Sequence, residues 1–183
     1  MKKPPPLPAE ILRRVLRVAR FDGISVLGFA GACALVSAAM GDVAEAIVGL
    51  IVAAAGAIEL HGATLLRAGN FRGMRWLVSS QAYLMSAILG YAALKLQHPD
   101  VATLHRIMTQ YSATAGQDAM DQLNAQLQEQ GMTMDQALVG FLTLVYLALA
   151  AATLVYQGGM IVYYMRRRDA VAAALEEEDP LQG

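Results

Sequence analysis

Four long apolar stretches constrain the fold of this chain more than any other feature of its sequence. They run from residue 21 to 40, 43 to 66, 76 to 96 and 137 to 165. A helix needs about 20 mostly apolar residues to cross the hydrocarbon core of a bilayer, and each stretch meets that length. None of them alternates polar with apolar residues as the strands of a membrane barrel do. We therefore predict an all-α integral membrane protein with four transmembrane helices.

The composition agrees with this prediction. Apolar residues make up 56% of the 183 residues and charged residues 16%, against about 45–50% and about 25% in ordinary soluble domains. In water, four helices that are apolar on every side would all need burial, which a chain of this length cannot provide. We expect the protein to be located in the inner (plasma) membrane of a bacterium.

Lysines and arginines are distributed unevenly between the segments that flank the spans. All but two of the 14 lie before residue 21, between 67 and 75, or directly after 165; the exceptions are Lys95 and Arg106. Basic residues are enriched on the cytoplasmic side of membrane proteins, so both termini are predicted to be cytoplasmic. A cleaved signal peptide is the alternative for the first span, but its apolar run of about 20 residues exceeds the 7–15 of such a signal.

Residues 1–20 contain a basic amphipathic segment. Its arginines, which we expect to face lipid headgroups, are Arg13, Arg14, Arg17 and Arg20. Two interpretations stay open: the helix lies on anionic lipid at the cytoplasmic surface, or it continues directly into the first span. Nucleic-acid binding is not expected, because no aromatic residues interleave with the arginines.

The segment between the third and fourth spans, residues 97–132, is too long for a simple connector. Two amphipathic stretches separated by "SATAG" predict an extracytoplasmic helical hairpin whose apolar stripes pack on each other or on another subunit. "TMDQ", from Thr133, has capping-box spacing at the start of the fourth span. In the cytoplasmic tail, residues 167–183, three glutamates oppose the helix dipole, so we expect the helix to fray there.

Polar residues inside the spans are the candidate functional groups, because ionisable side chains are costly in a bilayer. Glu59 lies about 10 Å from the inner end of the second span, on the rise of an α-helix. Gln81, Tyr156 and Gln157 lie at a similar depth on the other spans. We expect Glu59 to form an interhelical hydrogen bond with Gln81 or Gln157. His61, two residues further on, should point to a different side of the helix.

Small and acidic residues add two further predictions. Gly28 and Gly31 in "GFAGACA" predict a close packing face on the first span. Asp42 and Glu45 lie at the outer end of the second span, where they could form an acidic vestibule on the same helix face as Glu59.

These features support two hypotheses for the function. The first is a homo-oligomeric channel or small carrier for cations or protons, in which Glu59 is the intramembrane charge site. The alternative is a non-transporting membrane scaffold or assembly subunit that binds a partner through its outer hairpin or N-terminal helix. No catalytic constellation, cofactor motif or metal motif is present, so we expect neither enzymatic activity nor a bound cofactor.

Overall fold

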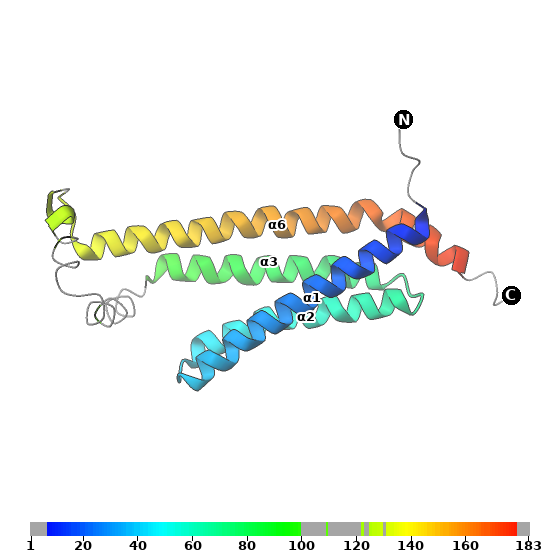
Figure 1. The fold of residues 1–183 in the computed structure, drawn as a ribbon, viewed down its shortest axis with the longest axis horizontal. Coiled ribbons are helices and arrows are strands. Elements are labelled where there is room, and N and C mark those ends of the chain that lie inside the picture. Colours follow the sequence, from blue (N-terminus) through cyan, green and yellow to red (C-terminus); the bar gives the residue numbers. More distant parts are fainter. Residues whose placement is uncertain (1–6, 100–108, 110–121, 123–124, 130, 179–183) are drawn as a thin grey trace, which may run out of the picture. The chain divides into compact units, whose positions relative to one another are not determined.

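A computed structural model describes residues 7–99, 109, 122, 125–129 and 131–178. Within this part of the chain there are helices and no strands (Figure 1). The long helices are α1 (Pro8–Ala39), α2 (Val43–Arg67), α3 (Gly73–Gln97) and α6 (Met134–Glu178). All four are long and apolar enough to cross a membrane, so the prediction of four such helices is confirmed.

The chain forms two units. The first comprises residues 1–88 and 153–183, and the second comprises residues 89–152. The first unit contains α1, α2, the start of α3 and the end of α6, and it holds the side-chain hydrogen bonds that join these helices.

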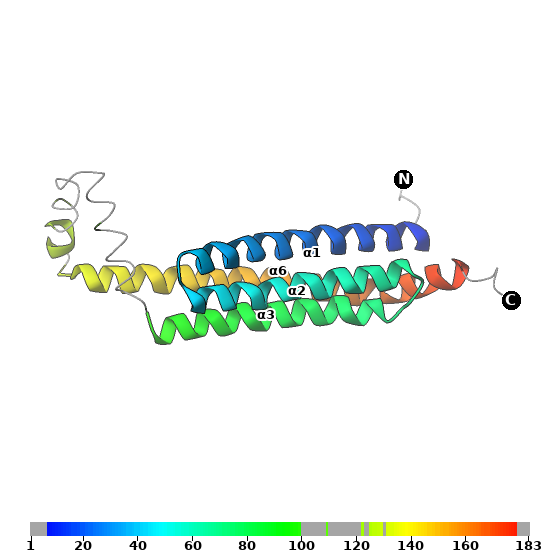
Figure 2. The ribbon, with the colours of Figure 1, turned by 90° about the horizontal axis from the view of Figure 1, so that it is seen from below.

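Helices α1 and α2 pack along each other after a short turn (Figure 2). Gly41 makes this turn with a φ of +79°, a left-handed conformation that glycine adopts readily. The contact is closest at Gly56, where an added Cβ would lie 2.6 Å from the backbone oxygen of Gly23. Small residues therefore let the two backbones approach, as in many membrane helix pairs.

Two predicted small residues do not take part in this contact. A Cβ added at Gly28 or at Gly31 would meet nothing within 4 Å. The prediction of a packing face there is therefore wrong for contacts within the chain. The face of α1 that meets α2 instead includes Gly23 and Ala34, and Ala34 lies against Gly49. The rotation of α1 about its own axis determines which of its small residues contact α2.

An apolar core forms at the end of the first unit where the arginines are concentrated. It joins all four helices through Leu12, Val15, Ala19, Ala63, Leu66, Met74, Leu77, Tyr164, Val171 and Ala174. Figures 1 and 2 show the N-terminal end of α1 and the C-terminal end of α6 together at this end.

This core explains the outcome of two sequence-based expectations. Of the two interpretations of the basic N-terminal segment, the structure shows the second: α1 is one unbroken helix, and Leu12 and Val15 are covered by protein rather than by lipid. The expected fraying after residue 166 is wrong, because α6 continues to Glu178. Val171 and Ala174 are fully buried, and this burial stabilises the helix against its unfavourable terminal charges.

The second unit contains the start of α6, which begins with a capping box. The backbone N–H of Gln136 donates to Thr133 Oγ1 at 3.3 Å, and Thr133 N–H donates to Gln136 Oε1 at 3.0 Å. The capping box expected from "TMDQ" is confirmed. The rings of Tyr91 and Tyr146 meet edge to face at 6.0 Å. The predicted outer hairpin falls largely on residues outside those that the structure describes.

Candidate intramembrane acidic site

The first unit buries a carboxyl group that the sequence analysis did not single out. Asp22 lies on α1 and is 6% exposed. The amide Nε2 of Gln81, on α3, donates to its Oδ2 at 2.9 Å, and the hydroxyl of Tyr156, on α6, donates to its Oδ1 at 2.9 Å. Asp22 thus connects three helices through its two oxygens.

The second buried carboxyl belongs to Glu59 on α2, which is 1% exposed. Its Oε1 accepts a hydrogen bond of 2.7 Å from the hydroxyl of Tyr164 on α6. Asp22 and Gln81 also interact with the Glu59 carboxyl, so the two acids belong to one group of polar side chains. We call this group the acidic layer; it consists of Asp22, Glu59, Gln81, Tyr156 and Tyr164, and we include Gln157, which is buried directly after Tyr156 on α6.

Hydrogen-bond acceptors outnumber donors in the acidic layer. The side-chain oxygens Gln81 Oε1 and Gln157 Oε1 are both buried and have no hydrogen-bond partner. Buried polar atoms in proteins nearly always have one, since leaving them unpaired costs about 1–3 kcal/mol. The orphaned oxygen of Gln81, a residue that contacts both carboxyl groups, forms with the buried oxygen of Gln157 on α6 an environment that favours a proton, a cation or another donor.

The predicted polar residues are distributed differently from the expectation. Glu59 was expected to bond with Gln81 or Gln157; its short hydrogen bond comes from Tyr164, and Gln81 also interacts with its carboxyl group. Gln81 and Tyr156 also donate hydrogen bonds to Asp22, which was not an expected partner. Polar residues predicted to lie at a similar depth do meet, but which of them form hydrogen bonds with each other depends on how each helix is rotated about its axis.

His61 lies outside the acidic layer. It is exposed on α2, and its ring meets that of Trp76 edge to face at 5.2 Å. Glu59 and His61 therefore occupy different faces of α2. Nothing in this arrangement joins the imidazole to the buried carboxyl groups.

Asp42 and Glu45 also lie away from the layer. Asp42 caps α2, because its Oδ1 accepts a hydrogen bond of 3.1 Å from the backbone N–H of Glu45. Along the helix, Glu45 is about 20 Å from Glu59 at 1.5 Å per residue. Asp42 therefore has a local structural role as the N-cap of α2, and the acidic vestibule stays a prediction.

The sequence does contain a signal for Asp22. Leu12, Val15, Ala19 and Asp22 follow helical spacing, so Asp22 continues the apolar stripe of the N-terminal segment. An acid at a core position of such a stripe is unusual. This signal is weak in the sequence alone, because Asp22 lies at the junction between the basic segment and the first apolar span.

The basic residues Arg13, Arg14, Arg17 and Arg20 lie on the exposed side of α1 apart from the acidic layer. Among the described residues, no three His, Cys, Asp or Glu side chains cluster closely enough to hold a metal ion. The layer offers only oxygen atoms as ligands, which suit hard cations or protons rather than transition metals.

Comparison of the chain with family models, with characterised proteins and with solved structures finds no match. Its function therefore has to be inferred from its own residues.

Proposed function

We propose that this protein is a membrane carrier for protons or small cations, with Asp22 and Glu59 as the groups that bind the transported ion. The observation that carries this proposal is the burial of two neighbouring carboxyl groups among too few hydrogen-bond donors. Ionisable groups within a membrane mark ion pathways and proton relays more often than ordinary packing positions.

The chemistry of the layer supports a hard, positively charged substrate. Two carboxyl groups supply negative charge, and the free oxygens of Gln81 and Gln157 supply neutral ligands. The hydroxyl groups of Tyr156 and Tyr164 each have an oxygen that can accept as well as donate. Binding of a proton or cation here would remove the shortage of donors.

The location of the layer favours a carrier over a pore shared between subunits. All six of its residues come from the first unit of one chain, and Glu59 is enclosed by that unit alone. A homo-oligomer remains part of the proposal, but each copy would hold its own ion site.

The orientation that we propose places both termini in the cytoplasm. The positive residues of α1, the α2–α3 turn and α6 lie at one end of the first unit, which suits the cytoplasmic face. Glu59 would then lie in the inner half of the bilayer, about 10 Å from that face.

Flux measurements on reconstituted protein test this proposal. The full chain would be placed in liposomes, and proton, sodium and potassium gradients would be applied in turn. We expect ion movement with the natural protein and a large loss in Asp22→Asn and in Glu59→Gln. Both substitutions keep an oxygen that can accept the tyrosine hydrogen bond, so they change charge with little change in shape.

Asp169→Asn is the matched control, because Asp169 is an exposed carboxyl on α6 outside the layer. Its flux should equal that of the natural protein. Equal flux in Asp22→Asn, Glu59→Gln and the natural protein would refute the assignment of the site.

The alternative hypothesis, a non-transporting scaffold, is favoured by one observation. The Tyr164–Glu59 hydrogen bond at 2.7 Å could serve only to hold α2 against α6. In that case natural protein would pass none of the three ions, and Glu59→Gln would leave both stability and assembly unchanged.

A further inference from the structure

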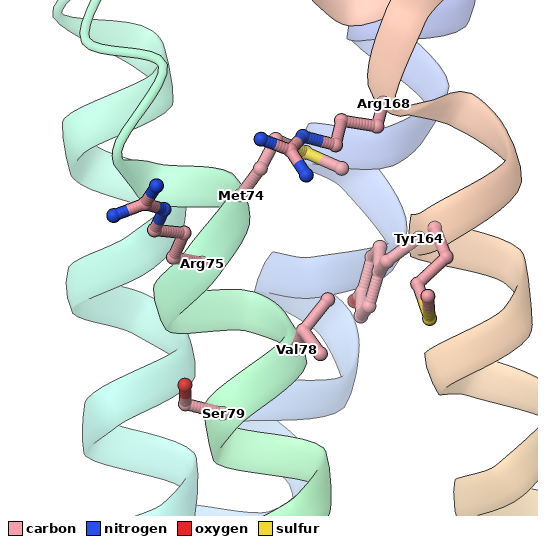
Figure 3. A pocket seen from close by; sticks show the side chains of 7 residues that line it. Met74, Arg75, Val78, Ser79, Tyr164 and Arg168 are labelled. Carbon is pink, nitrogen blue, oxygen red and sulfur yellow. The ribbon is translucent and has the colours of Figure 1, made fainter.

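A cavity of about 420 Å³ opens between α3 and α6 at the arginine-bearing end of the first unit (Figure 3). Its apolar wall is formed by Met74, Val78 and Met165, and its polar wall by Arg75, Ser79 and Arg168. The ring of Tyr164 faces Val78 across the cavity. Figure 3 shows Arg168 extending from α6 toward Met74 on α3.

The charges that line this cavity are all positive. Arg75 and Arg168 are its only charged lining residues, and both are exposed. The guanidinium group matches phosphate geometry because it can donate two parallel hydrogen bonds. The cavity also lies beside the N-terminal turn of α3, where the helix dipole favours a negative group.

We infer that this cavity binds an anionic phospholipid, with its phosphate at Arg168, additional positive charge from Arg75 at the cavity rim, and its glycerol and upper acyl carbons against the apolar wall. The combination of arginines and methionine or valine side chains supports a lipid rather than free phosphate. Free phosphate would leave the apolar wall in water, whereas a lipid covers both walls. Basic cavities between membrane helices on the cytoplasmic side are suited to anionic headgroups.

This lipid site is separate from the proposed ion site but shares one residue with it. The Tyr164 side chain lines the cavity, while its hydroxyl binds Glu59. The inference does not depend on transport, because it is tested by lipid retention and not by ion flux.

The experiment compares lipids retained by the full chain in a neutral detergent. Phosphatidylglycerol, phosphatidylcholine and inorganic phosphate would be titrated separately, with bound molecules counted by native mass spectrometry. We expect the natural protein to retain phosphatidylglycerol in preference to the other two. Arg75→Gln and Arg168→Gln should each weaken retention about fivefold, and together about thirtyfold, from the usual contribution of one arginine at a membrane surface.

Arg166→Gln is the matched control for Arg168→Gln. Arg166 is an exposed arginine two residues away on α6 and does not line the cavity. The Arg166→Gln variant should retain phosphatidylglycerol as the natural protein does. Val78→Trp, which fills the cavity without changing charge, should also weaken retention, and thermal unfolding would verify that each variant is folded.

Three results would overturn the inference. An equal loss of phosphatidylglycerol retention in Arg166→Gln and Arg168→Gln would indicate that the lipid is attracted by the overall surface charge and not by this cavity. Retention of phosphatidylcholine equal to that of phosphatidylglycerol would show that the arginines do not select anionic lipid. Binding of inorganic phosphate as tightly as lipid would assign the site to a free anion.

Discussion

Gln81 Nε2 donates a hydrogen bond of 2.9 Å to Asp22 Oδ2, joining α3 to α1 across 59 residues of sequence. This bond is buried, and the other oxygen of the same carboxyl group is held by Tyr156. Asp22 is therefore a structural junction as well as a candidate ion ligand, and these two roles make different predictions.

The Asp22–Gln81 pair should be energetically coupled. We expect Asp22→Ala and Gln81→Leu each to lower the free energy of unfolding, and the double variant to lose about 1 kcal/mol less than the sum. The reason is that either substitution alone already removes the shared bond. Unfolding by a denaturing detergent in mixed micelles measures this coupling. Additive losses would contradict a direct bond.

Tyr164 and Tyr163 offer a matched pair for the bond to Glu59. Tyr164→Phe removes the hydroxyl that donates to Glu59 and should lower the free energy of unfolding by about 1–2 kcal/mol. The hydroxyl of Tyr163 is buried with no hydrogen-bond partner. Tyr163→Phe should therefore be neutral or stabilising, while its ring keeps its edge contact with Tyr164. Unfolding curves of the two variants check this difference, and equal losses would contradict it.

Gly56 and Gly28 test the close approach of α1 and α2. Gly56→Ala places a Cβ 2.6 Å from the backbone nitrogen of Leu27, which cannot move without separating the helices. We expect a loss of about 1–3 kcal/mol. Gly28→Ala, with nothing within 4 Å, should be neutral or gain up to about 1 kcal/mol from helix propensity. The midpoint of thermal unfolding in detergent ranks the two; the reverse order would refute this packing.

The C-terminal part of α6 should contribute to stability. Val171 is fully buried against the start of α1, so Val171→Ala should cost about 2 kcal/mol for the two lost methyl groups and the cavity left behind. Val155 on the same helix is 78% exposed, and Val155→Ala is the control that should change little. Limited proteolysis after residue 166 gives a second measurement, since a packed tail resists cleavage. Rapid cleavage of the natural protein would be inconsistent with this packing.

The proposed orientation can be tested with reporters at the C-terminus. A green fluorescent protein fusion should be fluorescent, and an alkaline phosphatase fusion should be inactive, because the tail is expected in the cytoplasm. Replacing the three arginines at 166–168 with glutamine should weaken this preference. An active phosphatase fusion would place the basic end outside and invert the depth assigned to Glu59.

The extent of the helices was predictable where the flanking residues are strongly polar or contain glycine. The second span was expected at 43–66, and α2 runs from Val43 to Arg67. The fourth helix extends further than expected, to Glu178, and the first extends to Pro8, as one of the two interpretations of the N-terminal segment expected. Those extensions depend on the apolar core, in which Val15 and Val171 bring segments near opposite ends of the chain into one cluster.

The sequence by itself determined that there are four long apolar helices, because hydrophobicity and length are local properties of each segment. It also identified Glu59 as a buried charge, since no position at that depth can reach water easily. Only the tertiary structure decided that Tyr164 holds Glu59 and that Asp22 joins Gln81 to Tyr156. Those choices depend on the rotation of each helix about its axis, which is set by close contacts such as that between Gly23 and Gly56.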